Sequence, residues 1–165
     1  MKKSTLILFL SVFASCATFI NTSTPPSIEK KSKIAVLPLI NNSETPMSGF
    51  KAKNIIENEF YSKGFYVMPL ESFYSDENFS EKEIKEALFQ LKEKGADYAL
   101  YGYINEWRYK SGADYEPAVS LTLNIYDVRS EKIIWSAGGS KTMSSYKSAG
   151  ITAQKLIKNL LSPIK

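Results

Sequence analysis

The chain has 165 residues, a formal net charge of +4, no histidine and a single cysteine, Cys16. A chain of this length buries a substantial core in one ordinary domain, so it needs neither disulfides nor a structural metal to fold. The positive charge is small and scattered, whereas nucleic-acid binders are strongly basic over one face. Composition therefore argues against a disulfide scaffold and against nucleic acid as a partner.

Residues 1–15 are typical of a secretory signal peptide. A basic start precedes the apolar run LILFLSVFA, which is shorter than the roughly 20 residues of a membrane-spanning helix. The tetrapeptide FASC at residues 13–16 resembles the bacterial lipobox, in which a peptidase cuts before a cysteine that carries diacylglycerol. We therefore expect Cys16 to be the lipidated first residue of the mature protein and to attach it to a membrane of the cell envelope.

Residues 16–32 are predicted to be the lipidated cysteine and a flexible tether. They show no apolar periodicity, and Pro25 and Pro26 stiffen an otherwise polar stretch. Residues 33–165 are expected to form a single periplasmic domain, because apolar periodicity begins there and continues into a final amphipathic helix.

The domain is predicted to be α/β, with the order βαβαβββα and a mixed sheet flanked by helices. The first strand–helix–strand unit implies parallel pairing, and short polar connections between the last three strands imply an antiparallel meander. Glycines end two of the helices, and a capping box begins the second. The predicted strands are 33–39, 65–68, 98–109, 119–126 and 132–140, and the predicted helices are 48–63, 81–94 and 153–164.

The predicted strands differ in how they should be buried. Strand 33–39 is continuously apolar, which predicts burial on both faces. Strands 98–109 and 119–126 alternate, so each is expected to have one apolar face and one polar or aromatic face. We expect Leu123 and Ile125 to lie on a helix-covered face together with apolar residues of the second helix. These helix residues are Ile84, Leu88 and Leu91.

Catalytic residues are not apparent in the sequence. The chain lacks histidine and a free cysteine, which are the commonest general base and a common nucleophile. The glycines fit no phosphate-binding loop, and no calcium-loop pattern of oxygen ligands occurs. The sequence therefore predicts a protein that is not an enzyme and uses no cofactor or metal. The acidic residues beside predicted strands are interpreted as turn and edge residues: Glu106, Asp114, Glu116 and Asp127.

Strand 98–109 and the loop after it hold the candidate partner-binding residues. Tryptophan, tyrosine and arginine dominate binding hot spots, and the polar hairpin loop at residues 108–117 is longer than a turn needs. Period-two alternation places the tyrosines and the tryptophan on one face of this strand. Two alternatives stay open: a helix covers that face, or Trp107 plugs the end of the core. The candidates are Tyr101, Tyr103, Trp107, Arg108 and Tyr109.

Three motifs resemble the N-terminal domains of the curli-secretion-channel (CsgG-type) and TolB families. They are IAVLPLINNS at residues 34–43, KGADYALYGYI at residues 94–104, and NIYDV with IIWS within residues 124–136. The resemblance covers most of residues 33–163 and is nearest to spirochaetal and myxobacterial envelope lipoproteins. Each motif is a strand, a turn or a helix end, so the resemblance implies the fold and the cellular setting most directly.

The resemblance implies a membrane-anchored, non-enzymatic lipoprotein that acts as an assembly or accessory factor for a cell-envelope machine. Secretion, polysaccharide export and peptidoglycan synthesis are the processes that members of the family serve. The expected location is the outer membrane, facing the periplasm, with an envelope protein as partner and homo-oligomerisation left open. The alternative is a subunit of a CsgG-like outer-membrane secretion channel, which needs membrane-spanning hairpins that the predicted strands do not supply.

Overall fold

The computed structural model describes residues 17–70, 79–110 and 115–165. The predicted signal peptide, Cys16 and the centre of the long hairpin loop, with Asp114, lie outside the described residues. The strands are β1 (Thr18–Thr22), β2 (Lys33–Val36), β3 (Ile40–Asn41), β4 (Tyr66–Val67), β5 (Tyr98–Tyr109), β6 (Pro117–Asp127) and β7 (Lys132–Thr142). The helices are α1 (Ser48–Ser62), α2 (Glu81–Glu93) and α3 (Ala149–Leu161).

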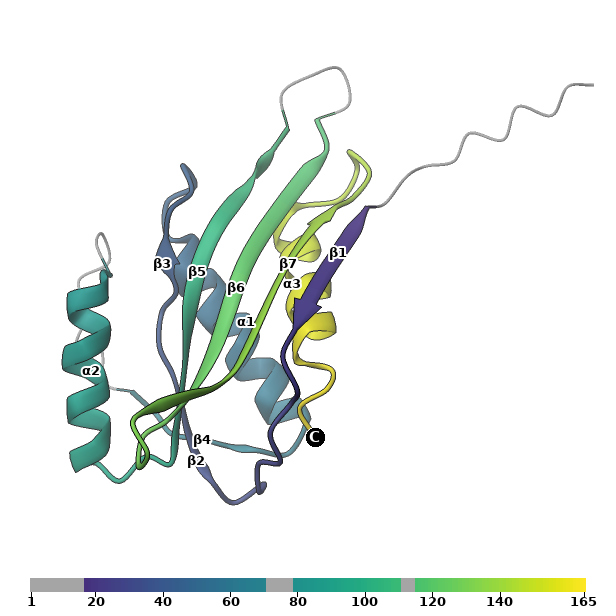
Figure 1. The fold of residues 1–165 in the computed structure, drawn as a ribbon. Helices are drawn as coiled ribbons and strands as arrows, with labels where there is room; N and C mark the ends of the chain where they lie inside the picture. The colour runs from purple at the N-terminus through teal and green to yellow at the C-terminus, as the bar shows by residue number, and fades with distance from the viewer. Residues whose placement is uncertain (1–16, 71–78, 111–114) are drawn as a thin grey trace, which may run out of the picture.

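The strands form one mixed sheet in the order β1-β7-β6-β5-β2-β4, with β3 continuing beside β5. Strands β5, β6 and β7 form an antiparallel meander, whereas β2, β3 and β4 join in parallel. Helices α1 and α3 cover one face of the sheet, and α2 lies against the other (Figure 1). This arrangement confirms the predicted α/β domain with a mixed sheet and an antiparallel C-terminal meander.

Two hydrophobic clusters lie on the two sides of the sheet. The larger one holds the apolar stripes of α1 and α3, and the smaller one lies under α2. Ile34 and Val36 of β2 enter the larger cluster. Ala35 and Leu37 enter the smaller one. All four side chains are at most 1% exposed, which confirms the predicted burial of this strand on both faces.

The helix ends agree with the predicted caps. Gly64 and Gly95 follow α1 and α2 with φ angles of 78° and 71°, a left-handed conformation that glycine adopts without strain. At the start of α2 the Ser80 amide donates a hydrogen bond to Glu83 Oε2 at 2.6 Å. The Ser148 hydroxyl caps α3 by accepting a hydrogen bond from an amide of its first turn. These local signals therefore set the end of α1, both ends of α2 and the start of α3.

The predicted packing of the second helix against Leu123 and Ile125 is wrong. Both residues lie in the larger cluster, on the face that α1 and α3 cover. Ile84 and Leu91 of α2 lie in the smaller cluster on the opposite face, and Leu88 packs at its edge. Alternation shows which residues of a strand share a face, but it does not show which helix covers that face.

Strand β5 contains a bulge that the sequence pattern did not predict. Its register with β6 shifts between Ile104 and Glu106, so Asn105 is an extra residue. One extra residue reverses the alternation beyond it. Trp107 therefore enters the larger cluster, and Tyr109 follows it to that side of the sheet. The prediction that these two side chains share a face with the tyrosines under α2 is wrong for this reason.

The segment predicted to be a flexible tether begins with a strand. β1 pairs antiparallel with β7, from Thr18 opposite Lys141 to Thr22 opposite Ala137. Gly139 of β7 allows this close approach, because a Cβ at that position would lie 2.7 Å from the Phe19 carbonyl oxygen. So short a segment forms a strand only when a distant strand pairs with it, and the local sequence does not report that pairing.

Candidate functional site

One end of the sheet gathers the start of β1, the end of β5, the start of β6 and the β7–α3 connection (Figure 1). We call it the hairpin end. The Ala17 carbonyl accepts a hydrogen bond from the Thr142 amide at 3.0 Å, and the Met143 amide donates one to the Pro117 carbonyl at 3.2 Å. Because Cys16 directly precedes Ala17, the predicted lipid anchor is next to the hairpin end.

The hairpin end exposes three tyrosines and carries two lysines, Lys110 and Lys147. Tyr109 is 48% exposed, Tyr115 is 67% exposed and Tyr146 is 80% exposed. Lys110 is exposed after β5, and Lys147 Nζ lies 5.0 Å from the centre of the Tyr146 ring. Tyrosine and lysine side chains both combine an apolar body with a polar tip, a composition that is common where proteins meet a membrane surface.

The candidate partner-binding residues do not form one surface. Tyr101 and Tyr103 lie on the face that α2 covers, where Tyr101 is only 9% exposed. The Tyr103 hydroxyl donates a hydrogen bond to Glu81 Oε1 at 3.2 Å. Burial is the main cause that raises the pKa of both phenols, so they keep their protons at neutral pH. Of the alternatives left open by the sequence, the one in which a helix covers this face therefore holds for Tyr101 and Tyr103.

The other three candidates lie at or near the hairpin end in different environments. Trp107 is 4% exposed and belongs to the larger hydrophobic cluster, as an end-of-core plug would. Arg108 and Tyr109 are exposed, and Arg108 Nε donates a hydrogen bond to Glu106 Oε1 at 3.0 Å. Only Arg108 and Tyr109 therefore offer free surface, and a binding role for the set stays a prediction.

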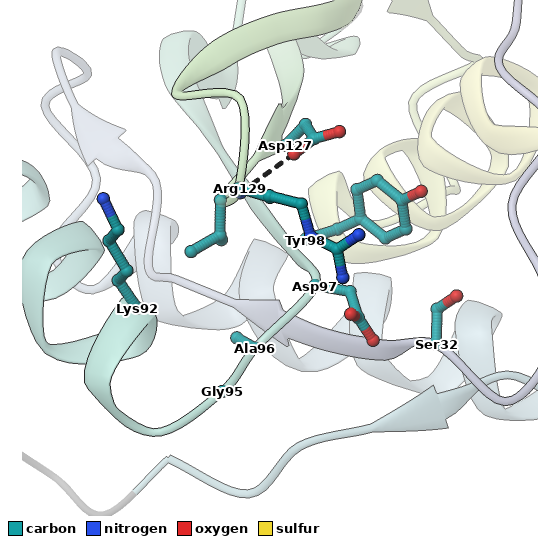
Figure 2. A pocket seen from close by; sticks show the side chains of 9 residues that line it. Ser32, Lys92, Gly95, Ala96, Asp97, Tyr98, Asp127 and Arg129 are labelled. Atoms are coloured by element: carbon teal, nitrogen blue, oxygen red, sulfur yellow. Dashed lines mark hydrogen bonds between the residues drawn. The ribbon is translucent and has the colours of Figure 1, made fainter.

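The opposite end of the sheet holds an open pocket of about 390 Å³, shown in Figure 2. Asp97 Oδ2 accepts a hydrogen bond from the Lys33 amide at 2.8 Å, and Asp127 Oδ1 accepts one from the Arg129 amide at 2.9 Å. Asp127 therefore holds the β6–β7 turn, in agreement with its interpretation from sequence, whereas Asp97 joins the start of β5 to the start of β2. Burial raises the pKa of Tyr98, so its phenol also stays neutral in this pocket.

The described part of the chain holds no group of three or more side chains suited to binding a metal ion. Within the same residues, no helix has the length and apolar character needed to cross a membrane.

Sequence reasoning included Tyr115 only as part of the candidate loop at residues 108–117, and it missed Tyr146 and β1. The two tyrosines stand alone in polar connections, so no periodic pattern singles them out. The two neighbouring apolar residues Phe19 and Ile20 were the available signal for β1. Two neighbouring residues point to opposite faces of a strand, and a pattern of two residues is too short to identify a strand.

No family model and no curated protein matches the chain. Among solved structures, the chain is similar to PelC from Paraburkholderia phytofirmans, which is a dodecamer. The two are 30% identical, the match covers 89% of this chain and 96% of that one, and the TM-score is 0.74.

Two further structures share the fold at lower identity. The lipoprotein GNA1162 from Neisseria meningitidis is 19% identical, with 79% of this chain and 96% of that one covered and a TM-score of 0.58. The LpoB C-terminal domain from Salmonella enterica is 17% identical, with 70% and 86% covered and a TM-score of 0.53. The more specific resemblance to CsgG-type and TolB domains stays a prediction.

Proposed function

This chain belongs to the same family as PelC from Paraburkholderia phytofirmans, and we propose that it is a lipid-anchored accessory subunit of a cell-envelope machine. In this proposal Cys16 carries the acyl chains, the folded domain stands in the periplasm, and the protein catalyses no reaction itself. The machine serves secretion, polysaccharide export or peptidoglycan synthesis, the processes that the sequence resemblance implies.

The observation that carries the proposal is the position of the exposed tyrosines and lysines. They lie at the hairpin end, where β1 is separated from Cys16 by Ala17 alone. Two or three acyl chains hold a protein stably, and so short a link keeps the hairpin end close to the lipid headgroups. Tyrosine favours the membrane interface, and each lysine near an anionic surface contributes about 1 kcal/mol. The hairpin end therefore rests on the membrane in this proposal.

The same orientation leaves the rest of the domain free for protein partners. The β6–β7 turn with Arg129 lies at the other end of the sheet (Figure 1). In the proposed orientation this turn points into the periplasm. The proposed partners are an envelope protein and further copies of this chain, because the related PelC is a dodecamer. The proposed location is the outer membrane, on the side that faces the periplasm.

The anchor is tested by mass spectrometry of the native mature protein. The expected N-terminal residue is Cys16 with its acyl chains, and Cys16→Ala is expected to lack them and to lose signal-peptide cleavage. The control is Ser15→Ala, which keeps the cysteine and small residues before it, and which should still be processed. An unmodified Cys16 thiol in the mature wild-type protein would refute the anchor.

The orientation is tested with a polarity-sensitive fluorophore on a single introduced cysteine, since acylation leaves no other thiol. Tyr146→Cys labelled in the lipidated protein, on phosphatidylglycerol-containing vesicles, is expected to emit at shorter wavelength and to be quenched by brominated lipids. The control is Tyr61→Cys, at a residue that is 57% exposed on α1, and it should emit as in water. Equal emission and quenching at the two positions would contradict the proposed contact.

A further inference from the structure

β1 is an uncovered edge of the sheet. It pairs with β7 on one side, and the described residues place no strand on its other side. Ala17 and Ser23 form backbone hydrogen bonds with β7, and bonded residues alternate along an antiparallel strand. The N–H and C=O groups of Thr18, Ile20 and Thr22 therefore point away from β7. Charges, prolines and bulges usually protect such an edge, and β1 has none of them.

Phe19 makes this edge apolar. Its side chain is 67% exposed, on the side of the sheet where α2 lies. Its cross-strand neighbour is Ser140, which in turn lies opposite Ser120 of β6. These small hydroxyl side chains give the ring little cover, so Phe19 protrudes from the β1 flank.

A groove lies on the other flank of the molecule, between α2 and the β6–β7 turn. Its volume is about 400 Å³, and Lys92 and Glu131 form an ion pair at its rim. Phe89 is 66% exposed there, on a side of α2 that is otherwise polar. The apolar side chains that line the groove are Leu88, Phe89, Tyr126 and Val128. In Figure 1 the β1 flank is at the right of the molecule and the α2 flank is at the left, although the Phe19 side chain and α2 are on the same face of the sheet.

We propose that the β1 edge of one copy packs against the α2 flank of the next copy, with Phe19 entering the groove. The inference rests on the proposed function, because it requires copies of the chain anchored in one membrane. A contact between two different patches repeats from copy to copy and closes into a ring when the rotation allows it. Phe19 and the groove supply two such patches, one a protruding ring and the other a hollow.

The lipid anchor argues against the simplest alternative, a two-fold pairing of β1 with β1. That pairing runs the two strands antiparallel, so the two Cys16 residues would leave the shared sheet at opposite ends. Ala17 alone separates each anchor from its strand, which gives about 3.5 Å of chain. The strand itself is about 17 Å long, so the link cannot turn one anchor back to the other end. If the β1 edge contacts another copy in the same leaflet, it therefore meets a different patch of that copy.

The two patches lie at different heights along the strands, and this difference in height sets how neighbouring copies are arranged. Phe19 is level with Ser120 of β6, whereas the groove lies beside Tyr126, about 20 Å further along that strand. The strands of neighbouring copies must therefore lie oblique to the axis of the assembly. In this arrangement the first residue of every β1 still faces the same membrane leaflet, where the lipid anchors must lie.

Thiol cross-linking in the full-length, detergent-extracted lipoprotein tests the contact. The double variant Phe19→Cys/Phe89→Cys, treated with a flexible bismaleimide, is expected to give a ladder of dimers, trimers and larger products. Each single variant should give almost no cross-linked product. A head-to-tail contact places position 19 of one copy opposite position 89 of the next, so neither position meets its own equivalent. The matched control is Phe19→Cys/Tyr61→Cys, at a residue of similar exposure on α1, and it should give no ladder. As an independent readout, Phe19→Ser and Phe89→Ser should each weaken assembly by about tenfold or more.

The outcomes separate this inference from the proposed function. Strong dimers from Phe19→Cys alone would mean that β1 meets β1, and would overturn the head-to-tail contact. An assembled protein that gives no ladder in the double variant would place the contact elsewhere and also overturn it. A monomeric wild-type protein would overturn it together with the proposed assembly, while the state of Cys16 and the Tyr146→Cys emission would still report on the anchor.

Discussion

Tyr103 and Trp107 point to opposite faces of the sheet, although both belong to β5 at an even spacing. The bulge at Asn105 is the cause, since the extra residue reverses the alternation between them. Tyr103 reaches Glu81 of α2, whereas Trp107 fills the larger hydrophobic cluster. A single inserted residue thus converts an expected aromatic surface into a core contact.

Trp107 is predicted to contribute strongly to the free energy of unfolding, whereas Tyr109 is predicted to contribute little. Trp107→Ala should lower the free energy of unfolding by about 3–5 kcal/mol, because a buried ring leaves a cavity. Tyr109→Ala should cost about 0.5 kcal/mol or less, since that ring is 48% exposed. Urea denaturation of both variants provides the measurement. A Trp107→Ala protein with near-normal stability would show that the side chain is not a core plug.

The docking of β1 is predicted to depend on Gly139. In Gly139→Ala the added Cβ would lie 2.7 Å from the Phe19 carbonyl oxygen and 3.2 Å from Leu156 Cδ1, so β1 must move away. Hydrogen exchange at the β1 amides should therefore become faster. Gly138→Ala is the matched control, because the nearest atom to its added Cβ, Thr122 Oγ1, lies at an ordinary 3.5 Å. Unchanged exchange in Gly139→Ala would mean that β1 tolerates the methyl group.

Truncating a side chain is predicted to cost more stability on one face of β6 than on the other. Leu123 is fully buried in the larger cluster, so Leu123→Ala should cost about 2–5 kcal/mol. Thr122 is partly exposed on the other face, and Thr122→Ala should cost far less. A denaturant titration of the two variants measures the difference. Equal losses would contradict the register between β6 and its neighbours.

The ion pair between Lys92 and Glu131 is predicted to give a small pH dependence. The hydrogen bond and charge of Lys92 hold the pKa of Glu131 below its ordinary value of 4.5, so the folded state favours the carboxylate. The stabilisation is present above pH 4.5 and is lost as the pH falls through the lowered pKa of Glu131. Both side chains are exposed, so the effect should be small and should weaken in high salt.

Denaturation midpoints of Glu131→Gln and the wild-type protein at pH 7 and pH 3 measure this effect. The variant is expected to be slightly less stable at pH 7, and the difference should become smaller at pH 3. The control is Glu93→Gln, an exposed residue of α2 outside this ion pair, and it should show no such convergence. A difference of the same size at pH 3 would assign the effect to something other than the charge of Glu131.

Local sequence patterns determined the elements that depend on neighbours in the chain. The run that begins at Ile34 is continuously apolar, so both of its faces have to be buried in any fold. In the structure it lies between the two clusters. Gly64 and Gly95 end their helices because glycine takes a positive φ without a Cβ penalty. The apolar stripe of α3 is likewise buried as predicted. These features follow from residue chemistry within a few positions.

Only the tertiary structure decided the features that depend on distant pairing. The bulge at Asn105 belongs to the register between β5 and β6, and neither strand by itself contains that register. The side of the sheet that α2 covers depends on the path of the chain, so the partners of Leu123 could not be read from its spacing. β1 is a strand because Gly139 of β7 leaves room for Phe19, a contact between residues far apart in the sequence. Periodicity carries information along one element, whereas contacts between elements are set by the whole fold.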